Sequence, residues 1–536
     1  MVRVFSSTVA WLSNWRRFCA LMTLIFIVRG VFVMSVLPPF EGWDEYQHLA
    51  YIAYLAEEGR APVLGEGNDV PRSLYPALVR YPHCDACIDQ IGRVGALDYD
   101  AYWESRSPPH VREDAPRVLL YQAQQAPLYY WLATPAYRLL SGEDNTLALM
   151  TLLRGVNLLF GAAAVLVVLL ALGKLLRTGP HRYVIGLLIA LQPLFLLNCI
   201  RVANDALAVL LGTVTVVILL LLSDRRYWLG VTLGGLLLGL AILAKTINLA
   251  LIPFVVFVFA SLLWKRRITS RRAVLGLGLV FGLAVAVTFP YFHFNLTHFG
   301  MLTPLQESVT NRDAGKDIGD LVQAVLDTEW WDKFRPRYFR HSLWYGAWSA
   351  LRLPGFLATC YEYNLYLAVL GFALVLKPHT RRERLLFEEP AALWRVVILC
   401  VGVAAALAFH AVQARMALGY FATNAWYAAV TFPWLLCLYY QGLALYPGKW
   451  IARLLATELL LLSLFAEIYG VLGVMVPAYA GVGWGALARA HLAAIHLPGC
   501  GPGLTIPAAI MTCLLTAFAV AVWIDRDQRA AGPMDQ

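Results

Sequence analysis

The sequence repeats one feature from end to end: long apolar stretches, each close to the roughly 20 residues that an α-helix needs to cross the hydrocarbon core of a bilayer. Charged residues make up only 14% of the chain, against roughly 25% in soluble domains, so water cannot be its main solvent. In lipid, a helix satisfies its own backbone hydrogen bonds. We therefore predict an all-α polytopic membrane protein with about twelve spans, at residues 18–37, 147–174, 183–200, 204–222, 229–244, 247–264, 273–293, 361–377, 393–411, 425–445, 454–474 and 505–524.

Basic residues recur in every second connection between these stretches, at 174–182, 225–226, 265–272, 377–384, 449–453 and 526–529. Loops rich in Lys and Arg stay in the cytoplasm. The alternation predicts a multi-pass protein of the cytoplasmic (inner) membrane, with both termini cytoplasmic and the other connections facing the periplasm or exterior. Because the net charge of +9 is spread over these loops, no nucleic-acid partner is expected.

The connections on the outer side are unequal in length. Residues 38–146 and 294–360 form two large outer loops, and 476–504 form a modest one. Residues 1–293, 294–360 and 361–536 are therefore expected to be an N-terminal module, an aromatic and basic outer loop, and a set of C-terminal helices. The cytoplasmic connections are short and carry no GxxxxGK[ST] phosphate loop. We expect the activity to lie on the outer face.

Three of the nine cysteines fall in outer loops. Cys84 and Cys87 form a CxxC pair beside His83, and Cys500 stands alone. A single CxxC lacks the second ligand pair of a zinc ribbon, so a local disulfide or free thiols are favoured over a metal. The six others lie in or beside apolar stretches and are expected to pack as small hydrophobes.

Acidic residues follow the first stretch directly. Asp44 and Glu45 precede apolar positions with helical spacing over 46–54, which predicts an amphipathic helix lying in the membrane interface. Asp44 and Gln47 approximate a capping box at the start of this helix. A carboxylate at the level of lipid headgroups can also accept a proton from a hydroxyl nucleophile. Capping and chemistry both stay open.

Two outer segments combine aromatic residues with polar or basic ones. The first, 121–132, contains Tyr129 and Tyr130, and the second, 330–348, contains Trp344. Aromatic belts anchor proteins at the membrane interface. Alternatively, aromatic faces stack on sugars, and arginine pairs with phosphate. Each segment is therefore interpreted as a belt or as a wall for a sugar or lipid head.

Ionisable residues at membrane depth usually face a bundle interior or a polar cavity. Arg29 and Arg154 are expected to pair with buried acids or carbonyls. Lys245 either snorkels to the headgroups or neutralises a bound phosphate. Asp205 either caps the next helix or joins Asp44, where the two carboxylates would hold a divalent ion (Mg²⁺ or Mn²⁺) or form a base with an orienting partner.

Taken together and in this order, these segments resemble the GT-C superfamily of polyprenyl-phosphate-sugar-dependent glycosyltransferases, which includes aminoarabinose transferases of lipid A and protein O-mannosyltransferases. The resemblance is clearest in the first half of the chain. The matching segments are Asp44-Glu45, Ala126 to Leu132 leading to Arg154, Asn204-Asp205, and Gly239 to Lys245.

The resemblance implies a GT-C-like bundle with interfacial helices in the first outer loop and a catalytic module at 1–293. It assigns chemistry to Asp44, Glu45 and Asp205, donor-phosphate binding to Lys245, Arg201 and Arg154, and sugar or lipid-head contacts to Tyr129, Tyr130 and Trp344. The expected partners are a polyprenyl-phosphate sugar donor, membrane lipids, and a glycan, lipid or protein acceptor.

A transporter or lipid-carrier flippase is the alternative function, since that class can also have a dozen spans. Transporters often show paired halves with interrupted helices near the midplane. No internal symmetry of that kind is visible in the sequence, which favours the glycosyltransferase.

Overall fold

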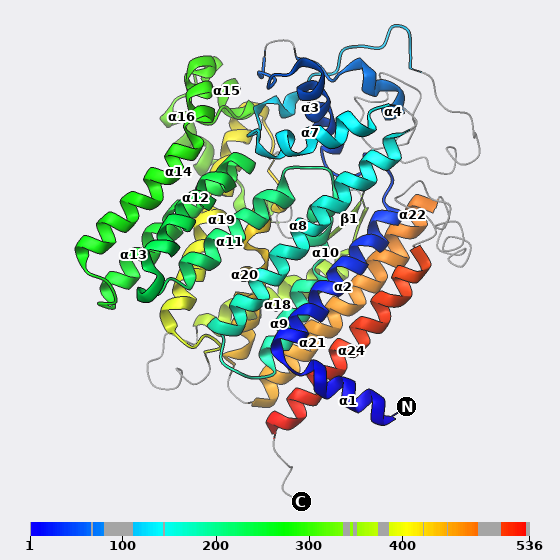
Figure 1. The fold of residues 1–536 in the computed structure, drawn as a ribbon, viewed down its shortest axis with the longest axis vertical. Coiled ribbons are helices and arrows are strands. Elements are labelled where there is room, and N and C mark those ends of the chain that lie inside the picture. The colour runs from blue at the N-terminus through cyan, green and yellow to red at the C-terminus, as the bar shows by residue number, and fades with distance from the viewer. Residues whose placement is uncertain are drawn as a thin grey trace, which may run out of the picture.

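The computed structural model describes residues 2–65, 68–79, 111–142, 145–335, 343–346, 351–373, 385–421, 423–446, 449–480 and 505–531. Within these ranges the fold is a bundle of helices (Figure 1). Its one sheet is a pair of short antiparallel strands, β1 (Trp344–Gly346) and β2 (Leu351–Arg352). The all-α prediction is confirmed.

Every predicted span coincides with a helix or a pair of short helices. In chain order these are α2 (Trp15–Val36), α8 (Thr146–Leu175), α9 (His181–Leu191) with α10 (Pro193–Ile200), α11 (Asp205–Leu220), α12 (Tyr227–Ala244), η5 (Thr246–Leu251) with α13 (Ile252–Trp264), α14 (Ser270–Phe299), α18 (Gly355–Ala373), α19 (Pro390–Leu418), η11 (Ala425–Thr431) with α20 (Phe432–Ala444), α21 (Lys449–Ile468) with η12 (Tyr469–Met475), and α24 (Thr505–Ala531). In the described ranges, eight helices are long and apolar enough to cross a membrane, or nine with the bent α9–α10 pair. The protein is thus a multi-pass membrane protein, and the count of twelve stays a prediction.

The third span is broken, with a bend of 47° between α9 and α10. Pro193 removes a backbone donor and starts α10, and the Gln192 side chain caps the new helix by accepting a hydrogen bond from the Phe195 N–H at 3.2 Å. Proline at the first helical position and a polar residue before it are the usual signals of a helix start. A single hydrophobic stretch therefore folds as two half-helices.

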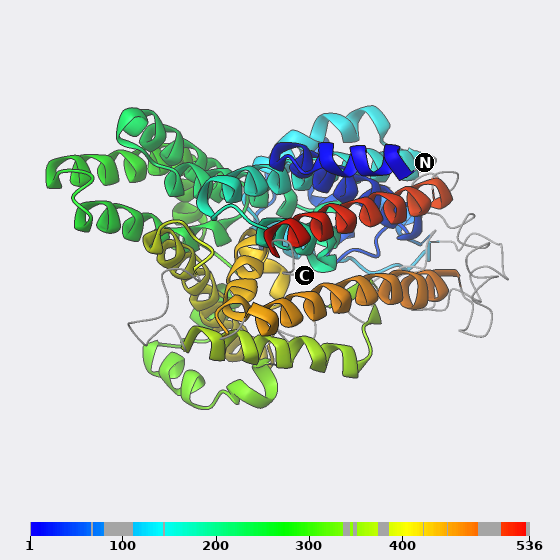
Figure 2. The ribbon, with the colours of Figure 1, turned by 90° about the horizontal axis from the view of Figure 1, so that it is seen from below.

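The outer loops gather at one end of the bundle. Figure 1 shows α3 (Glu45–Glu58), α7 (Leu128–Leu140), α15 (Gln306–Asp313) and α16 (Ile318–Leu326) there, with α1 (Val2–Leu12) at the opposite end. The N-terminal helices run beside α24, as Figure 2 shows from below. The described helices of the two large outer loops therefore lie at one end of the molecule, whereas β1 and β2 of the second loop lie beside α10 and η12.

The first-loop helices differ from the expected amphipathic pattern. In α3 every side chain from Glu45 to Leu55 is buried, because α7 and the segment just before α7 cover this helix. The apolar stripe over 46–54 is therefore part of a core. It is α7 that exposes apolar side chains, including Trp131, Leu132 and Leu139, which is typical of a helix lying at a membrane surface.

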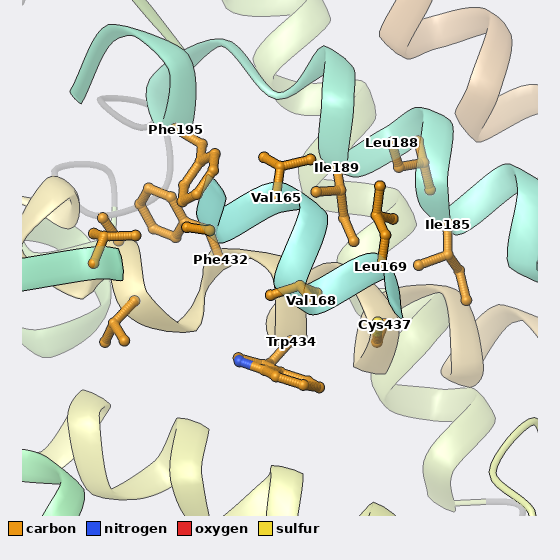
Figure 3. Packing of buried hydrophobic residues seen from close by; sticks show 14 of the residues in the cluster. Val165, Val168, Leu169, Ile185, Leu188, Ile189, Phe195, Phe432, Trp434 and Cys437 are labelled. Carbon is orange, nitrogen blue, oxygen red and sulfur yellow. The ribbon is translucent and has the colours of Figure 1, made fainter. Parts of the chain in front are cut away.

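The bundle interior is packed by branched and aromatic side chains. Figure 3 shows Val165 of α8 beside Ile189 of α9 and Leu169 of α8 near Ile185 of α9, with Phe195 of α10 near Phe432 of α20. The last two rings lie 6.4 Å apart, edge to face. This cluster joins the two halves of the broken span to α8 and α20.

Glycine lets two spans approach closely. A Cβ on Gly235 would lie 2.8 Å from the carbonyl oxygen of Val280, and one on Gly239 would lie 2.7 Å from Val287. Both contacts join α12 to α14. An ion pair joins α2 to α21, because the buried Arg29 guanidinium meets the partly buried Glu467 carboxylate. Arg29 also donates to the carbonyl of Ala190 at 2.8 Å, so the expectation that it pairs with acids or carbonyls is confirmed.

Candidate functional site

Asp44 lies in the sharp turn between the first span and α3. Its φ of 55° is in the left-handed region, a conformation that non-glycine residues keep only where their surroundings fix it. Its carboxylate accepts hydrogen bonds from the Tyr121 hydroxyl at 2.6 Å and from the Gln122 amide at 3.2 Å. It makes no side-chain cap on α3. The predicted capping box with Gln47 is therefore wrong, and the carboxylate faces the polar side chains of the loop.

A buried ion pair fixes this turn. Glu45 accepts hydrogen bonds from Arg154 of α8 at 2.8 and 2.6 Å, and neither side chain has exposed surface. Glu45 also accepts from the backbone N–H of Val202 at 2.8 Å. Arg154 donates in addition to the carbonyls of Leu37 and Pro38, both at 2.7 Å. The geometry points away from the expected phosphate contact of Arg154 and the expected chemistry of Glu45, because both side chains hold the backbone around Asp44.

A second polar cluster joins the ends of three helices. Asp205 begins α11, Lys245 follows α12, and Arg201 follows α10. The Asp205 carboxylate accepts from Lys245 Nζ at 2.6 Å and from Arg201 at 2.5 Å, and all three side chains are buried. Two cations thus share one carboxylate within this group of three residues. Lys245 lies inside the protein, which excludes the snorkelling alternative.

Asp44 is electrostatically connected to this second cluster. Arg201 donates to the carbonyl of Trp43, the residue before Asp44. Burial raises the pKa of the Asp44 carboxyl above its ordinary value, while the Tyr121 hydrogen bond and the charges of Arg201 and Lys245 lower it. Burial is the larger effect. A raised pKa is suited to a carboxylate that takes up a proton.

Aromatic side chains of η11 cover the two cations. Trp426 stacks on Trp43 with ring centroids 3.9 Å apart, and the Arg201 guanidinium lies 5.6 Å from the Trp43 ring. Lys245 Nζ lies 4.8 Å from the centre of the Tyr427 ring. Cations are attracted to such ring faces. The polar cluster is therefore closed on one side by η11, which comes from the C-terminal half of the chain.

The other face of η11 lines an apolar cavity of about 450 Å³. In a 3₁₀ turn, residues three apart share a face, and Ala425, Ala428 and Thr431 of η11 all border this cavity. Its remaining wall comes from α9, α10, α18, α19, α20, α21 and Leu343. The lining is mainly aliphatic and aromatic, which suits a hydrocarbon chain. One short element thus separates a charged cluster from an apolar cavity.

The aromatic pair of the first loop packs inside the protein. The Tyr130 ring packs against the Tyr51 ring at a tilt of 35° with centroids 3.8 Å apart, and its hydroxyl lies 2.8 Å from Nδ1 of His48. The Tyr129 hydroxyl accepts from Asn157 at 3.1 Å. Both tyrosines are almost fully buried. The arrangement points to packing rather than to the sugar contacts expected of Tyr129 and Tyr130.

The second outer loop reaches the site through a histidine. Glu307 of α15 lies 3.7 Å from Nε2 of His410 in α19, and Nδ1 of His410 contacts the Thr423 hydroxyl. The His410 ring lies 5.7 Å from Tyr427. Although burial raises it, the pKa of Glu307 is lowered overall by the partner His410. This pair fixes α15 above the aromatic side of the cluster.

A divalent ion shared by Asp44 and Asp205 does not fit these side chains. All four carboxylate oxygens already accept hydrogen bonds, and two cations occupy the space beside Asp205. The part of the chain that the structure describes also contains no group of three or more His, Cys, Asp or Glu residues able to hold a metal. We therefore derive no step through a metal ion.

Some predicted features lie outside the described residues: Cys84, Cys87, Cys500, and much of the aromatic and basic loop. Trp344 belongs to β1 by its backbone, and its side chain is outside the described part. Within that loop, Arg335 pairs with Glu362 of α18.

Three residues join the site without having been assigned to it from the sequence. Tyr121 and Gln122 lie in the segment interpreted as a belt or wall. Their adjacent hydroxyl and amide donors were the feature of the sequence that could have assigned them to the site. Tyr427 falls within an expected span at 425–445, where apolar periodicity concealed the 3₁₀ turn that presents it.

No protein-family model matches the sequence, and no curated protein matches it. Among solved structures, ArnT from Cupriavidus metallidurans bound to undecaprenyl phosphate aligns over 95% of this chain and 77% of its own, with 16% identity and a TM-score of 0.44. The apo state of that protein aligns over 96% and 77%, with 14% identity and the same TM-score. An Archaeoglobus fulgidus oligosaccharyltransferase tethered with an acceptor peptide aligns over 85% and 56%, with 14% identity and a TM-score of 0.35.

All three likenesses have TM-scores below 0.5 and carry no argument about the superfamily or the reaction of this chain. The activity is argued below from the site itself.

Proposed function

We propose that the protein is a membrane glycosyltransferase that moves a sugar from a polyprenyl-phosphate donor to a hydroxyl group of a lipid, glycan or protein. The motifs that carry the GT-C resemblance supply Asp44, Asp205 and Lys245, and these residues lie in one cluster with Arg201. The active face is proposed to be the periplasmic or exterior side of the cytoplasmic membrane.

The observation that carries the proposal is the position of η11. On one side, its residues Trp426 and Tyr427 cover the Arg201–Lys245 pair, directly or through Trp43. On the other side, it borders the apolar cavity of about 450 Å³. A polyprenyl-phosphate sugar has a hydrocarbon chain, an anionic phosphate and a sugar in sequence. The apolar cavity on one side of η11 matches the hydrocarbon chain of such a molecule, and the cations Arg201 and Lys245 on the other side match its phosphate.

In the proposed reaction, the acceptor hydroxyl attacks the anomeric carbon of the donor sugar. The new glycosidic C–O bond forms while the bond between that carbon and the phosphate oxygen breaks, and the electron pair leaves with the lipid phosphate. The Asp44 carboxylate takes the acceptor proton. Lys245 and Arg201 stabilise the charge that develops on the phosphate, and Asp205 holds these two cations in place.

The test uses purified full-length protein in lipid nanodiscs, a panel of synthetic polyprenyl-phosphate sugars, and a membrane extract as the acceptor pool. Release of polyprenyl phosphate and incorporation of labelled sugar are measured together. Removing a general base typically costs about 10²–10⁴-fold in rate, which is expected for Asp44→Asn. Lys245→Met is expected to cost about 10²–10³-fold, as for the loss of one group that stabilises transition-state charge.

Asp114→Asn is the matched control, because Asp114 is an exposed carboxylate of the same loop that pairs only locally with Arg112. It should keep the wild-type rate. Full activity of both Asp44→Asn and Asp205→Asn would show that these carboxylates have no part in the reaction, and the assignment of roles would be withdrawn.

The broken helix α9–α10 favours the alternative of a transporter or lipid-carrier flippase, since interrupted helices are common in such proteins. Its Gln192 borders the apolar cavity. Movement of a polyprenyl-phosphate sugar across liposomes without formation of any glycosidic bond would support this alternative over the transferase.

A further inference from the structure

A second cavity, of about 670 Å³, lies at the other end of the bundle from Asp44. Its position follows from the chain direction: α8 leaves the first outer loop and ends at Leu175, and Arg177 lies at the cavity two residues later. The last turns of α13 and the first turn of α19 form the other walls. None of its lining residues belongs to the site described above.

Backbone hydrogen bonds hold the walls of this cavity together. The Arg177 N–H donates to the Leu386 carbonyl at 2.6 Å, and the Glu388 N–H donates to the Leu175 carbonyl at 2.9 Å. Residues 385–389 are thereby paired with the end of α8, just before α19 begins. The cavity is therefore bordered by a fixed backbone.

The charged side chains around the cavity are mainly cationic. Arg177 and Lys265 line it, against one lining carboxylate, Glu388, which is 57% exposed. The neighbouring Glu389 pairs with Arg267 at 2.6 Å and with Lys265 at 3.7 Å. Positive charge is thus in excess at the cavity.

A buried arginine behind the wall points to an anion. Arg395 is only 3% exposed, and its Nε donates to the hydroxyl of Ser261, a lining residue, at 2.7 Å. Its Nη2 has no hydrogen-bond partner in the described part of the protein. A buried guanidinium N–H without an acceptor is costly for a charged group. Arg395 is not a lining residue, so it contributes positive charge behind the Ser261 wall and not a direct ligand.

The remaining lining indicates an amphiphilic ligand. Trp264 and Trp394 border the cavity and are 89% and 54% exposed, as tryptophans are at the headgroup level of a bilayer. Phe257 and Ala260 continue the wall along α13, toward the middle of the bundle. Cations near the rim and an apolar wall below fit a lipid that carries a phosphate.

We propose that this cavity binds an anionic glycerophospholipid of the surrounding membrane, with the phosphate between Lys265 and Arg177 and the acyl chains along α13. Basic pockets between membrane helices are known sites for anionic headgroups. The inference goes beyond the proposed transfer reaction, because the cavity lies at the other end of the bundle from the Asp44 cluster.

The test is native mass spectrometry of delipidated full-length protein, titrated with phosphatidylglycerol or phosphatidylcholine. One phosphatidylglycerol molecule is expected to bind more tightly than phosphatidylcholine. One basic residue near a membrane surface contributes about 1 kcal/mol to anionic lipid binding, so Lys265→Gln should weaken this site about fivefold. Arg271→Gln is the matched control, since Arg271 is an exposed cation at the same end that does not line the cavity. The affinity of the Arg271→Gln variant for phosphatidylglycerol should be unchanged.

Three outcomes would overturn the proposal. Equal binding of the two lipids would mean that charge is not recognised. An equal loss in Lys265→Gln and Arg271→Gln would mean that the cavity is not the site. Displacement of the lipid by millimolar inorganic phosphate, with the phosphate alone protecting the protein against heat, would assign the site to free phosphate.

Trp394→Ala, which removes no charge, gives a second measure and is expected to weaken the binding of both lipids alike. None of these results bears on glycosyl transfer.

Discussion

At the scale of single residues, adjacent acids in the first loop have different environments. Asp44 accepts hydrogen bonds from two neutral groups, Tyr121 and Gln122, whereas Glu45 forms a fully buried ion pair with Arg154. In an ion pair of that kind, the carboxylate oxygens are engaged by the arginine and do not accept a proton from a substrate. The carboxylate with neutral partners and a raised pKa is the better proton acceptor.

The pH dependence of the proposed transfer tests this difference. Asp44 must be deprotonated to act as a base, so activity should fall as the pH drops through its raised pKa. Because the Tyr121 hydrogen bond lowers that pKa, Tyr121→Phe should move the acidic limb of the pH–rate profile to higher pH. Tyr137→Phe is the control, since the Tyr137 hydroxyl contacts Glu57 and not Asp44. An acidic limb unmoved in Tyr121→Phe would argue against Asp44 as the titrating group.

At the scale of elements, the site depends on contacts between helix ends. The Glu45–Arg154 pair connects the start of α3 to α8, and through Val202 to the turn before α11. Asp205 and Lys245 connect α11 to the end of α12. These ties hold Asp44 and the cations in fixed relative positions.

Replacing the two members of the buried pair separates stability from positioning. Arg154→Met leaves the buried Glu45 carboxylate without a cation and should destabilise the protein by about 3–5 kcal/mol, because a buried charge without a counter-charge is costly. Arg154→Met combined with Glu45→Met should recover most of the thermal stability, measured by unfolding in detergent, but not the transfer activity. A double variant that is both stable and active would show that the pair does not position Asp44.

At the scale of the whole molecule, the described helices of both large outer loops lie at one end, and described basic connections such as 225–226 and 265–272 lie toward the other (Figure 1). The assignment of these ends to the exterior and the cytoplasm rests on the distribution of Lys and Arg.

Labelling of single cysteines with a membrane-impermeant reagent tests this assignment in a variant without native cysteines. Glu113→Cys and Asp313→Cys, at exposed positions of the outer loops, should react in intact cells. Arg226→Cys and Arg271→Cys, exposed at the opposite end, should react only after the membrane is opened. The reverse pattern would place the Asp44 cluster on the cytoplasmic side and contradict the predicted orientation.

The sequence by itself determined that the protein lies in a lipid bilayer, that its fold is all-α, and where the apolar spans lie. Hydrophobic length and the cost of unsatisfied backbone groups in lipid are properties of local segments. It also indicated Asp44, Asp205 and Lys245, since ionisable residues beside apolar stretches are unusual. Only the tertiary structure decided which of the charges neutralise one another. Arg154 pairs with Glu45, 109 positions away in the chain, and Tyr427 reaches Lys245 from the other half of the molecule. The packing of the helices determines which charged residues pair, and a local sequence pattern does not contain that information.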